Sequence, residues 1–200
     1  MLTRLVNLDH QLFFLINRDL ANFILDIPME LFSNAEFWFS IWMIVFIWSL
    51  IKKRIEIIKV CVLSSIAVGI TDALAFQVLK PYFERLRPCY EFETFVRTLD
   101  EHCGGSFGFP SNHAANAMAF SIVLFLFLGR NKQKLKHTVV FLMPLVVGIS
   151  RSYLGVHYPG DVLAGFLLGG VIGFMCYKIF GRIFDIIYLK ISEITIRRIL

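Results

Sequence analysis

Charged residues are scarce in this chain. Asp, Glu, Lys and Arg make up only 18% of its 200 residues, whereas hydrophobic residues make up 57% and Phe alone occurs 21 times. Soluble proteins contain about 25% charged and roughly 45–50% apolar residues, so the composition argues against a water-soluble domain. The apolar residues also gather in long runs instead of recurring at helical or strand spacing. We therefore expect the chain to fold in a lipid bilayer.

The N-terminus lacks the uninterrupted apolar stretch of a cleavable signal peptide. Asp9, Arg18 and Asp19 interrupt its hydrophobic residues, and these charges are also too frequent for a spanning helix. We therefore expect residues 1–34 to form short interfacial helices that stay on the mature protein.

Five apolar stretches follow, each about 16–20 residues long and able to cross a hydrocarbon core of ~30 Å. They are residues 35–51, 60–79, 114–129, 138–155 and 162–177. The predicted fold is an all-α, polytopic membrane helix bundle with five to six transmembrane helices, forming a single domain over residues 1–200. Residues 35–177 form its transmembrane core, and residues 178–200 form a cytoplasmic tail.

Basic residues are distributed unevenly around these spans. Thirteen of the 20 Lys and Arg residues lie after the first, third and fifth spans. Basic residues of short loops stay in the cytoplasm, so this side is expected to be cytoplasmic, with the N-terminus outside and the C-terminus inside. A net charge of +5 would suit nucleic acid in a soluble protein. Because these basic residues flank membrane spans, we expect no nucleic-acid partner.

The outward ends of the second to fifth spans carry polar residues that the orientation rule does not explain. They are Lys80, Arg87, His113, Arg151, His157 and Asp161. Lys80, Arg87 and Arg151 favour an anion, and a guanidinium matches the oxygens of phosphate. Ser111 directly precedes an apolar helix and is expected to be its N-cap. The free N–H groups of that first turn, around Asn112, also favour phosphate.

The two histidines of this group have different surroundings. Asp161 follows His157 by four residues, and Pro159 and Gly160 between them predict that a helix begins near Pro159. The carboxylate can hold one ring nitrogen of His157 and leave the other as a nucleophile. His113 has no acid beside it in the sequence. At a helix N-terminus it is placed to act as a general acid and base.

Three segments resemble the motifs of the type 2 phosphatidic acid phosphatase superfamily. The family patterns are Lys-x6-Arg-Pro, Pro-Ser-Gly-His and Ser-Arg-x5-His-x3-Asp. Their counterparts here are residues 80–88 (KPYFERLRP), 110–113 (PSNH) and 150–161 (SRSYLGVHYPGD), in the same order and with the same spacings. One departure is Asn112, which stands where the family has Gly. We expect its backbone N–H to serve equally and its side chain to narrow the pocket.

The resemblance implies a membrane-embedded lipid phosphatase that forms a phosphohistidine intermediate and needs no metal or other cofactor. Carried over by position, His157 is the nucleophile, Asp161 orients it, and His113 protonates the leaving group and later activates water. The phosphoryl oxygens would be held by Lys80, Arg87, Ser111, Arg151 and the backbone around Asn112. Family members commonly have six spans, so residues 1–34 would stand in place of the first, which leaves the side of the N-terminus open.

The substrate is only partly defined by the sequence. A site between helices at the outer face of a membrane suits a lipid whose phosphate lies at headgroup level. Bacterial relatives act on undecaprenyl diphosphate, on phosphatidylglycerophosphate and on the 1-phosphate of lipid A. The short outer loop, residues 89–110, favours a small (pyro)phosphate head. Undecaprenyl diphosphate at the periplasmic face of a bacterial inner membrane is therefore the first expectation, and the other two lipids are alternatives.

A zinc site and a non-enzymatic anion site are two alternatives to a phosphatase site. Zinc bound by His113, His157 and Asp161 is disfavoured, because the surrounding cations would repel it. A non-enzymatic anion transporter or membrane scaffold would usually place its polar residues near the bilayer midplane. Asp72 and Gln77 are the chief candidates there, and a hydrogen bond inside the bundle accounts for them more simply. The oligomeric state is left open.

The four cysteines fall into two pairs. Cys61 and Cys176 lie inside predicted spans and are expected to be buried packing residues. Cys89 and Cys103 share the outer loop, which in a bacterial envelope faces an oxidising compartment. We predict a disulfide between them that closes a loop of about 15 residues, worth on the order of 3 kcal/mol in the chain-entropy model.

Small residues recur at a helical spacing in the last span. Gly165, Gly169 and Gly173 are four residues apart and therefore lie on one face of a helix. Such a stripe lets two helix backbones approach closely, so we interpret it as a packing face and not as a binding motif.

Overall fold

A computed structural model describes residues 2–99, 103–128 and 134–199. The described chain is almost entirely helical. Its elements are α1 (Leu2–Phe14), the π-helical turn η1 (Leu15–Asp19), α2 (Phe23–Ser33), α3 (Ala35–Ile51), α4 (Ile55–Leu74), the π-helical turn η2 (Ala75–Leu79), α5 (Lys80–Phe83), α6 (Pro88–Glu91), α7 (Asn112–Leu128), α8 (Lys134–Tyr153) and α9 (Pro159–Ile199).

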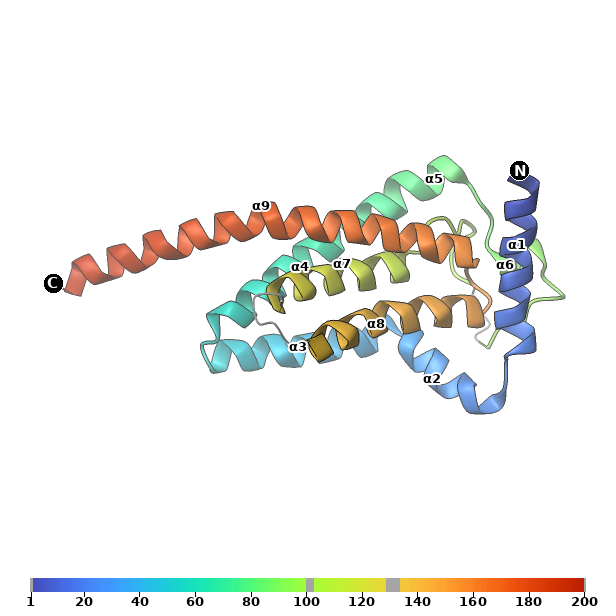
Figure 1. The fold of residues 1–200 in the computed structure, drawn as a ribbon, viewed down its shortest axis with the longest axis horizontal. Coiled ribbons are helices and arrows are strands. Elements are labelled where there is room, and N and C mark those ends of the chain that lie inside the picture. The colour runs from blue at the N-terminus through green and yellow to red at the C-terminus, as the bar shows by residue number, and fades with distance from the viewer. Residues whose placement is uncertain (1, 100–102, 129–133, 200) are drawn as a thin grey trace.

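Five helices, α3, α4, α7, α8 and α9, run along the long axis of the molecule (Figure 1). Helices α3, α7 and α8 coincide with predicted spans to within a few residues, α4 and η2 together contain the second span, and α9 contains the fifth and runs on to Ile199. The prediction of an all-α membrane bundle is confirmed. Among the described residues, Ile55–Phe83 and Pro159–Lys190 are long and apolar enough to cross a membrane. Helices α2 and α3, bent by 54° at their junction, would make a third span, whereas α7 and Val140–Tyr153 are apolar but shorter.

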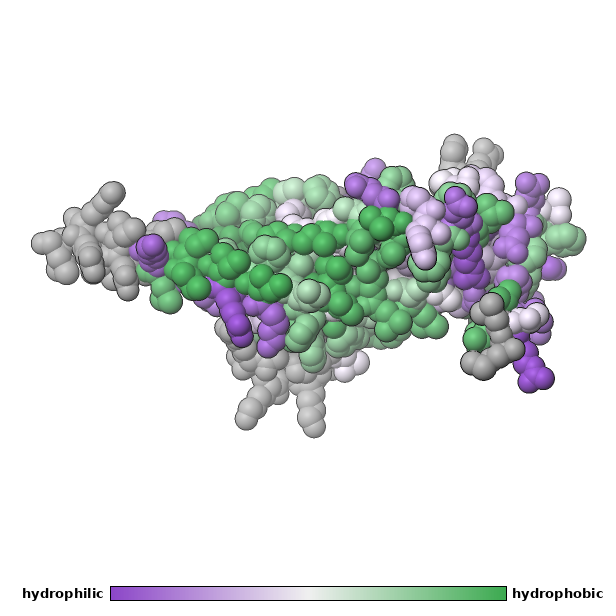
Figure 2. All heavy atoms as spheres, turned by 90° about the horizontal axis from the view of Figure 1, so that it is seen from above, coloured by the Kyte–Doolittle hydropathy of each residue, from purple (hydrophilic) through white to green (hydrophobic). Residues whose placement is uncertain are grey.

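The middle of the bundle is covered by apolar side chains. Figure 2 shows an apolar belt with polar residues gathered toward the end of the molecule that carries α1. Exposed apolar side chains of the bundle include Ile44 on α3 and Leu167 and Val171 on α9. An apolar surface of this extent would aggregate in water, but it matches the hydrocarbon core of a bilayer.

Helices α7 and α9 pack with their backbones in contact. A Cβ placed on Gly169 would stand only 2.0 Å from the carbonyl oxygen of Ala115, and Cβ atoms on Gly165 and Gly173 would each stand 2.6 Å from a carbonyl of the α7 segment. The glycine stripe is therefore a packing face, as predicted, and α7 is its partner. The close approach brings the N-terminal ends of the two helices together.

The two ends of the chain extend this bundle in different ways. Helix α1 lies across the end of the bundle (Figure 1), with Leu5 and Leu8 exposed while Phe13 is buried. That orientation suits an interfacial helix, and its contact with lipid stays a prediction. Helix α9 continues without a break to Ile199, so the residues after 177 are helical and continuous with the last span, and their place in the cytoplasm stays a prediction. Since no proline follows Pro159, nothing in that stretch interrupts the helix.

Candidate active site

Three cations singled out by the sequence act together on His157. This residue lies in the turn between α8 and α9 and is only 1% exposed. Burial lowers its pKa well below the ordinary value of 6.5, and the positive charges of Arg87, Arg151 and Lys80 lower it further. The guanidinium of Arg151 also donates to Ser33 Oγ at the end of α2. The imidazole is therefore neutral near neutral pH, which is the state in which a ring nitrogen can act as a nucleophile.

The loop before α7 holds two of these cations through its carbonyl groups. Lys80 donates from Nζ to the carbonyl oxygens of Phe107 and Gly108, at 3.0 Å and 3.4 Å. Arg87 donates from Nε to Phe107 at 3.3 Å and from Nη1 to the carbonyl of Cys103 at 2.9 Å. A carbonyl orients a cation without cancelling its charge. Both side chains therefore remain suited to bind a phosphate.

A disulfide spans this loop. In the structure Cys89 is bonded to Cys103, and their Cα atoms are 6.3 Å apart. The bond links the carbonyl that accepts from Arg87 to helix α6, which begins directly after Arg87. Cys61 and Cys176 are free and buried, as expected. The disulfide thus joins the loop to the segment that carries one of the phosphate-binding candidates.

The residues at the start of α7 are placed as predicted, but their side chains make different contacts. Ser111 directly precedes α7 and its carbonyl accepts from Ala115 N–H at 3.0 Å, so it occupies the predicted N-cap position. Its hydroxyl is fully buried and has no hydrogen-bond partner among the described residues, whereas its backbone N–H donates to the carbonyl of Asp161 at 3.0 Å. The Asn112 amide donates to Asp72 on α4 at 2.8 Å, and Asn116 donates to the same oxygen at 3.0 Å. Asp72 thus joins α4 to α7 by hydrogen bonds, but it is exposed, so these bonds lie at the surface of the bundle and not in its interior as expected.

Asp161 lies in the first turn of α9, which begins at Pro159 as predicted. Its Oδ2 atom is 3.5 Å from Nδ1 of His157 and accepts a hydrogen bond from the N–H of Tyr158 at 3.0 Å. The contact with His157 is longer than a normal hydrogen bond, and such contacts often tighten when substrate binds. His113 lies in the first turn of α7, and the charges that act on it include Arg151, Arg87 and Lys80. The two predicted catalytic histidines therefore lie in the field of the same three cations.

Two further charged residues complete the site, and the sequence did not single out either. Arg85 donates from Nη1 to Oδ1 of Asp161 at 2.8 Å and from Nη2 to Oδ2 of Asp9 at 2.6 Å. Arg85 occupies a variable position of the first motif, and Asp9 belongs to α1. The sequence held one signal for Arg85: it is a third cation, beside Lys80 and Arg87, within the nine residues of the first motif. The family pattern allows any residue at its position.

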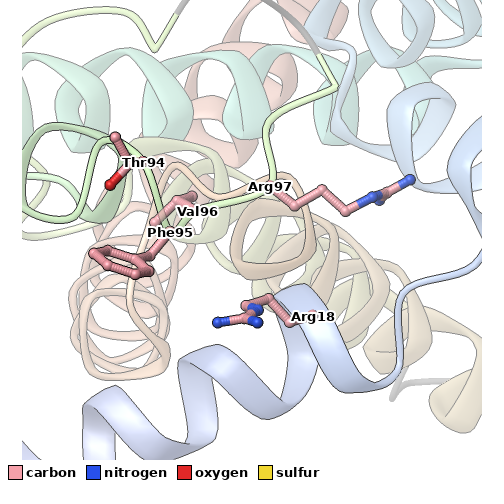
Figure 3. A pocket seen from close by; sticks show the side chains of 5 residues that line it. All are labelled: Arg18, Thr94, Phe95, Val96 and Arg97. Carbon is pink, nitrogen blue, oxygen red and sulfur yellow. The ribbon is translucent and has the colours of Figure 1, made fainter.

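A separate open hollow of about 410 Å³ lies beside η1 (Figure 3). It is lined by Arg18, Thr94, Phe95, Val96 and Arg97. The side chains of Arg18 and Arg97 point apart in Figure 3, and Arg97 pairs with Asp26 at 2.6 Å. None of the predicted site residues lines this hollow, so it is distinct from the cluster around His157.

Comparison with known proteins identifies the family. A family model described as the PAP2 superfamily matches residues 58–185, a range that contains all three motif segments. The chain belongs to the PAP2 superfamily. The family predicted from the motifs is thereby confirmed.

Two bacterial relatives show how far the likeness to other superfamily members extends. Lipid A 4'-phosphatase of Bacteroides thetaiotaomicron is 33% identical over 159 residues, which cover 77% of this chain and 69% of that protein. Phosphatidylglycerophosphatase B of Bacillus subtilis is 40% identical over 112 residues, which cover 52% of this chain and 51% of that protein. The matched regions thus span about two thirds of the first relative and about half of the second.

Solved structures show the same PAP2 fold. A phosphatidylglycerolphosphate phosphatase from Bacillus subtilis has a TM-score of 0.68 at 25% identity, covering 90% of this chain and 88% of that one. Aquifex aeolicus LpxE has a TM-score of 0.64 at 24% identity, covering 86% and 95%. The expected enzyme class, a hydrolase of phosphoric esters, agrees with the phosphatases among these superfamily members.

Proposed function

We propose that this chain removes phosphate from a membrane lipid through a phosphohistidine intermediate. The observation that carries the proposal is the convergence of Lys80, Arg87 and Arg151 on the neutral, buried imidazole of His157. Asp161 stands beside Nδ1 of that ring, which leaves Nε2 as the nucleophile. Cations around a buried nucleophile favour an anionic substrate and stabilise the charge that develops on its oxygens.

The reaction would proceed in two steps. Nε2 of His157 attacks phosphorus while the bond to the leaving oxygen breaks, and His113, which must enter this step protonated, donates a proton to that oxygen. His113 then takes a proton from water, whose oxygen attacks phosphorus. The phosphorus–nitrogen bond breaks, inorganic phosphate leaves, and His157 becomes neutral again. The buried Ser111 hydroxyl and Arg151 Nε have no hydrogen-bond partner among the described residues, and both are suited to bind the phosphoryl oxygens.

We propose that the site faces the outside of the cell, which in a bacterium is the periplasm. The turn between α3 and α4 lies at the end of the bundle opposite to α1 and carries Lys52, Lys53 and Arg54 (Figure 1). Short basic loops stay in the cytoplasm. A cysteine at exposed Lys53 should therefore resist a membrane-impermeant thiol reagent in intact cells, whereas one at exposed Glu93 should be labelled. Labelling of Lys53→Cys in intact cells would reverse this orientation.

Undecaprenyl diphosphate is the first substrate we propose. The outer loop, residues 89–110, is short and provides little protein to surround a large headgroup. A second candidate is the 4'-phosphate of lipid A, because the Bacteroides relative that matches 77% of this chain is named for that position. Phosphatidylglycerophosphate is the third, after the Bacillus relative.

A substrate panel tests these proposals. Purified protein in detergent is given each of the three lipids, and the release of inorganic phosphate is measured with His157→Gln as the control. We expect release from undecaprenyl diphosphate to be fastest and to persist in EDTA, because the three cations supply the charge stabilisation that a metal would otherwise provide. Equal release by His157→Gln would contradict the mechanism. Loss of activity on chelation, reversed by a divalent metal, would contradict independence from metal.

A further inference from the structure

We propose that Asp9 and Arg85 are positioning residues, which set the Asp161 carboxylate and through it the nucleophile. The inference rests on the proposed function, because it requires that Asp161 orient His157. It is carried by a chain of contacts that runs from α1, at the end of the bundle, to the first turn of α9.

Arg85 stands at the centre of this chain. Its two terminal nitrogens donate to two different carboxylates, those of Asp161 and Asp9, at 2.8 Å and 2.6 Å. The Asp161 side chain is completely buried, and that of Asp9 is 15% exposed. The guanidinium also stacks on Tyr158, with Cζ 4.1 Å from the ring centroid. A planar group held by two carboxylates and an aromatic face keeps one orientation.

This arrangement determines which oxygen of Asp161 faces the imidazole. Arg85 takes Oδ1, so Oδ2 is the oxygen that lies 3.5 Å from Nδ1 of His157. The N–H of Tyr158 binds the same Oδ2 at 3.0 Å. Rotation of the carboxylate would break both contacts. Arg85 therefore restricts the carboxylate to the orientation in which it can hold the ring of the nucleophile.

Asp9 acts on Asp161 by two routes. Its Oδ2 binds Arg85, while its Oδ1 accepts from the N–H of Gly160 at 2.7 Å, in the turn that carries Asp161. A carboxylate at this position is also favourable for the N-terminal end of a helix. A Cβ on Gly160 would stand 2.8 Å from Oδ2 of Asp9, so the site leaves no room for a larger residue.

Charge gives Asp9 a second role. If Arg85 paired with Asp161 alone, the guanidinium would neutralise the carboxylate that must support a positively charged imidazole. With Asp9 present, two carboxylates share one guanidinium, and the group keeps a net negative charge. We therefore expect Asp9 to maintain the electrostatic support that Asp161 gives to His157 during phosphoryl transfer.

Steady-state kinetics with lipid phosphate test the proposal. Asp9→Asn and Arg85→Gln should lower kcat by up to ~10²-fold, the cost of a misplacement of about 1 Å, with little change in KM. Arg85→Lys, which keeps the charge but not the planar fork, should fall between Arg85→Gln and the unmodified chain. Exposed Asp19 and Arg18 supply matched controls, and Asp19→Asn and Arg18→Gln should leave kcat unchanged. A change in KM alone would contradict a positioning role.

A double-mutant cycle separates positioning from a general loss of structure. If Asp9 acts through Asp161, then Asp9→Asn should cost nothing further in an Asp161→Asn background. A double variant slowed by the product of the two single effects would show that Asp9 acts independently, which would overturn the proposal.

An NMR measurement gives the same test without turnover. The Nδ1–H resonance of His157, identified by its loss in His157→Gln, should shift in Asp9→Asn and Arg85→Gln but not in Asp19→Asn. Turnover that survives in His157→Gln would contradict the proposed function itself. If His157→Gln is inactive and Asp161→Asn is impaired, but Asp9→Asn and Arg85→Gln behave like Asp19→Asn in kinetics and NMR, only the positioning proposal fails.

Discussion

The backbone N–H of Ser111 donates to the carbonyl oxygen of Asp161 at 3.0 Å and so ties the start of α7 to the start of α9. His113 follows the first of these residues by two positions, and His157 precedes the second by four. This backbone contact, together with the close packing of α7 on α9, helps to fix the relative placement of the two histidines.

Replacement of His157 and replacement of His113 should impair the reaction in different ways. His157→Ala should abolish both turnover and covalent labelling, because a nucleophile has no substitute. His113→Ala should slow formation and hydrolysis of the phosphoenzyme by about 10²- to 10⁴-fold, and a substrate with a very good leaving group should partly restore the first step. The measurement uses substrate labelled in its phosphoryl group and a rapid alkaline quench, in which phosphohistidine is stable. Retained turnover in His157→Ala would show that the nucleophile is another residue.

The lowered pKa of His157 should make stability depend on pH. Below the ordinary pKa of 6.5 the unfolded chain binds a proton at this position that the folded chain does not, so stability falls as the pH falls toward the folded pKa. The contribution is complete above that ordinary value. Thermal unfolding from pH 7.5 to 5.5 should therefore show a steeper loss of Tm for the unmodified chain than for His157→Gln. Parallel curves would mean that the imidazole is not neutral in the fold.

Removal of the disulfide should weaken both the fold and the binding of phosphate. The Cys89→Ser/Cys103→Ser double variant frees a loop with a sequence separation of 14, a loss of about 3 kcal/mol in the chain-entropy model. The carbonyl of Cys103 that accepts from Arg87 should then be less well held, so KM should rise. Thermal unfolding and kinetics with and without reductant check this, and reductant should not affect the double variant. Alkylation of both thiols in the denatured, unreduced protein would show that no disulfide forms.

Two adjacent glycines of α9 should respond oppositely to alanine. A Cβ on Gly169 would meet the Ala115 carbonyl at 2.0 Å, so Gly169→Ala should separate α7 from α9 and cost at least about 1–3 kcal/mol. The nearest atom to a Cβ on Gly170 is Met118 Cγ at 4.0 Å. Gly170→Ala should stabilise the helix by about 0.5–1 kcal/mol. Thermal unfolding in detergent compares the two, and equal Tm values would mean that the helices do not touch at Gly169.

The sequence predicts those parts of this molecule that depend on local patterns. The first predicted span, residues 35–51, has the same bounds as α3, because Asn34 caps its start by accepting from Phe37 N–H and Lys52 ends the apolar run. The start of α9 at Pro159 was predicted on similar grounds. The three motifs likewise predicted the three cations that act on His157.

The parts that the sequence did not predict depend on tertiary contacts. Asp9 and Arg85 are 76 residues apart, and no periodicity connects an acid on one short helix with an arginine in a distant turn. The backbone contact of Ser111 with α9 is likewise long-range: its N–H donates to the carbonyl of Asp161, while its carbonyl accepts from Ala115 N–H in its own helix. Local patterns do not specify contacts of this kind.

The position of α1 has a consequence for biogenesis. Asp9 leaves the ribosome well before its partner Gly160, which follows it by 151 positions. During synthesis the Asp9 carboxylate therefore stays without this partner until α3, α4, α7 and α8 and the start of α9 have been made. The candidate site therefore cannot assemble before the start of α9 is made, and a nascent chain that stops before residue 157 holds only one of its two histidines.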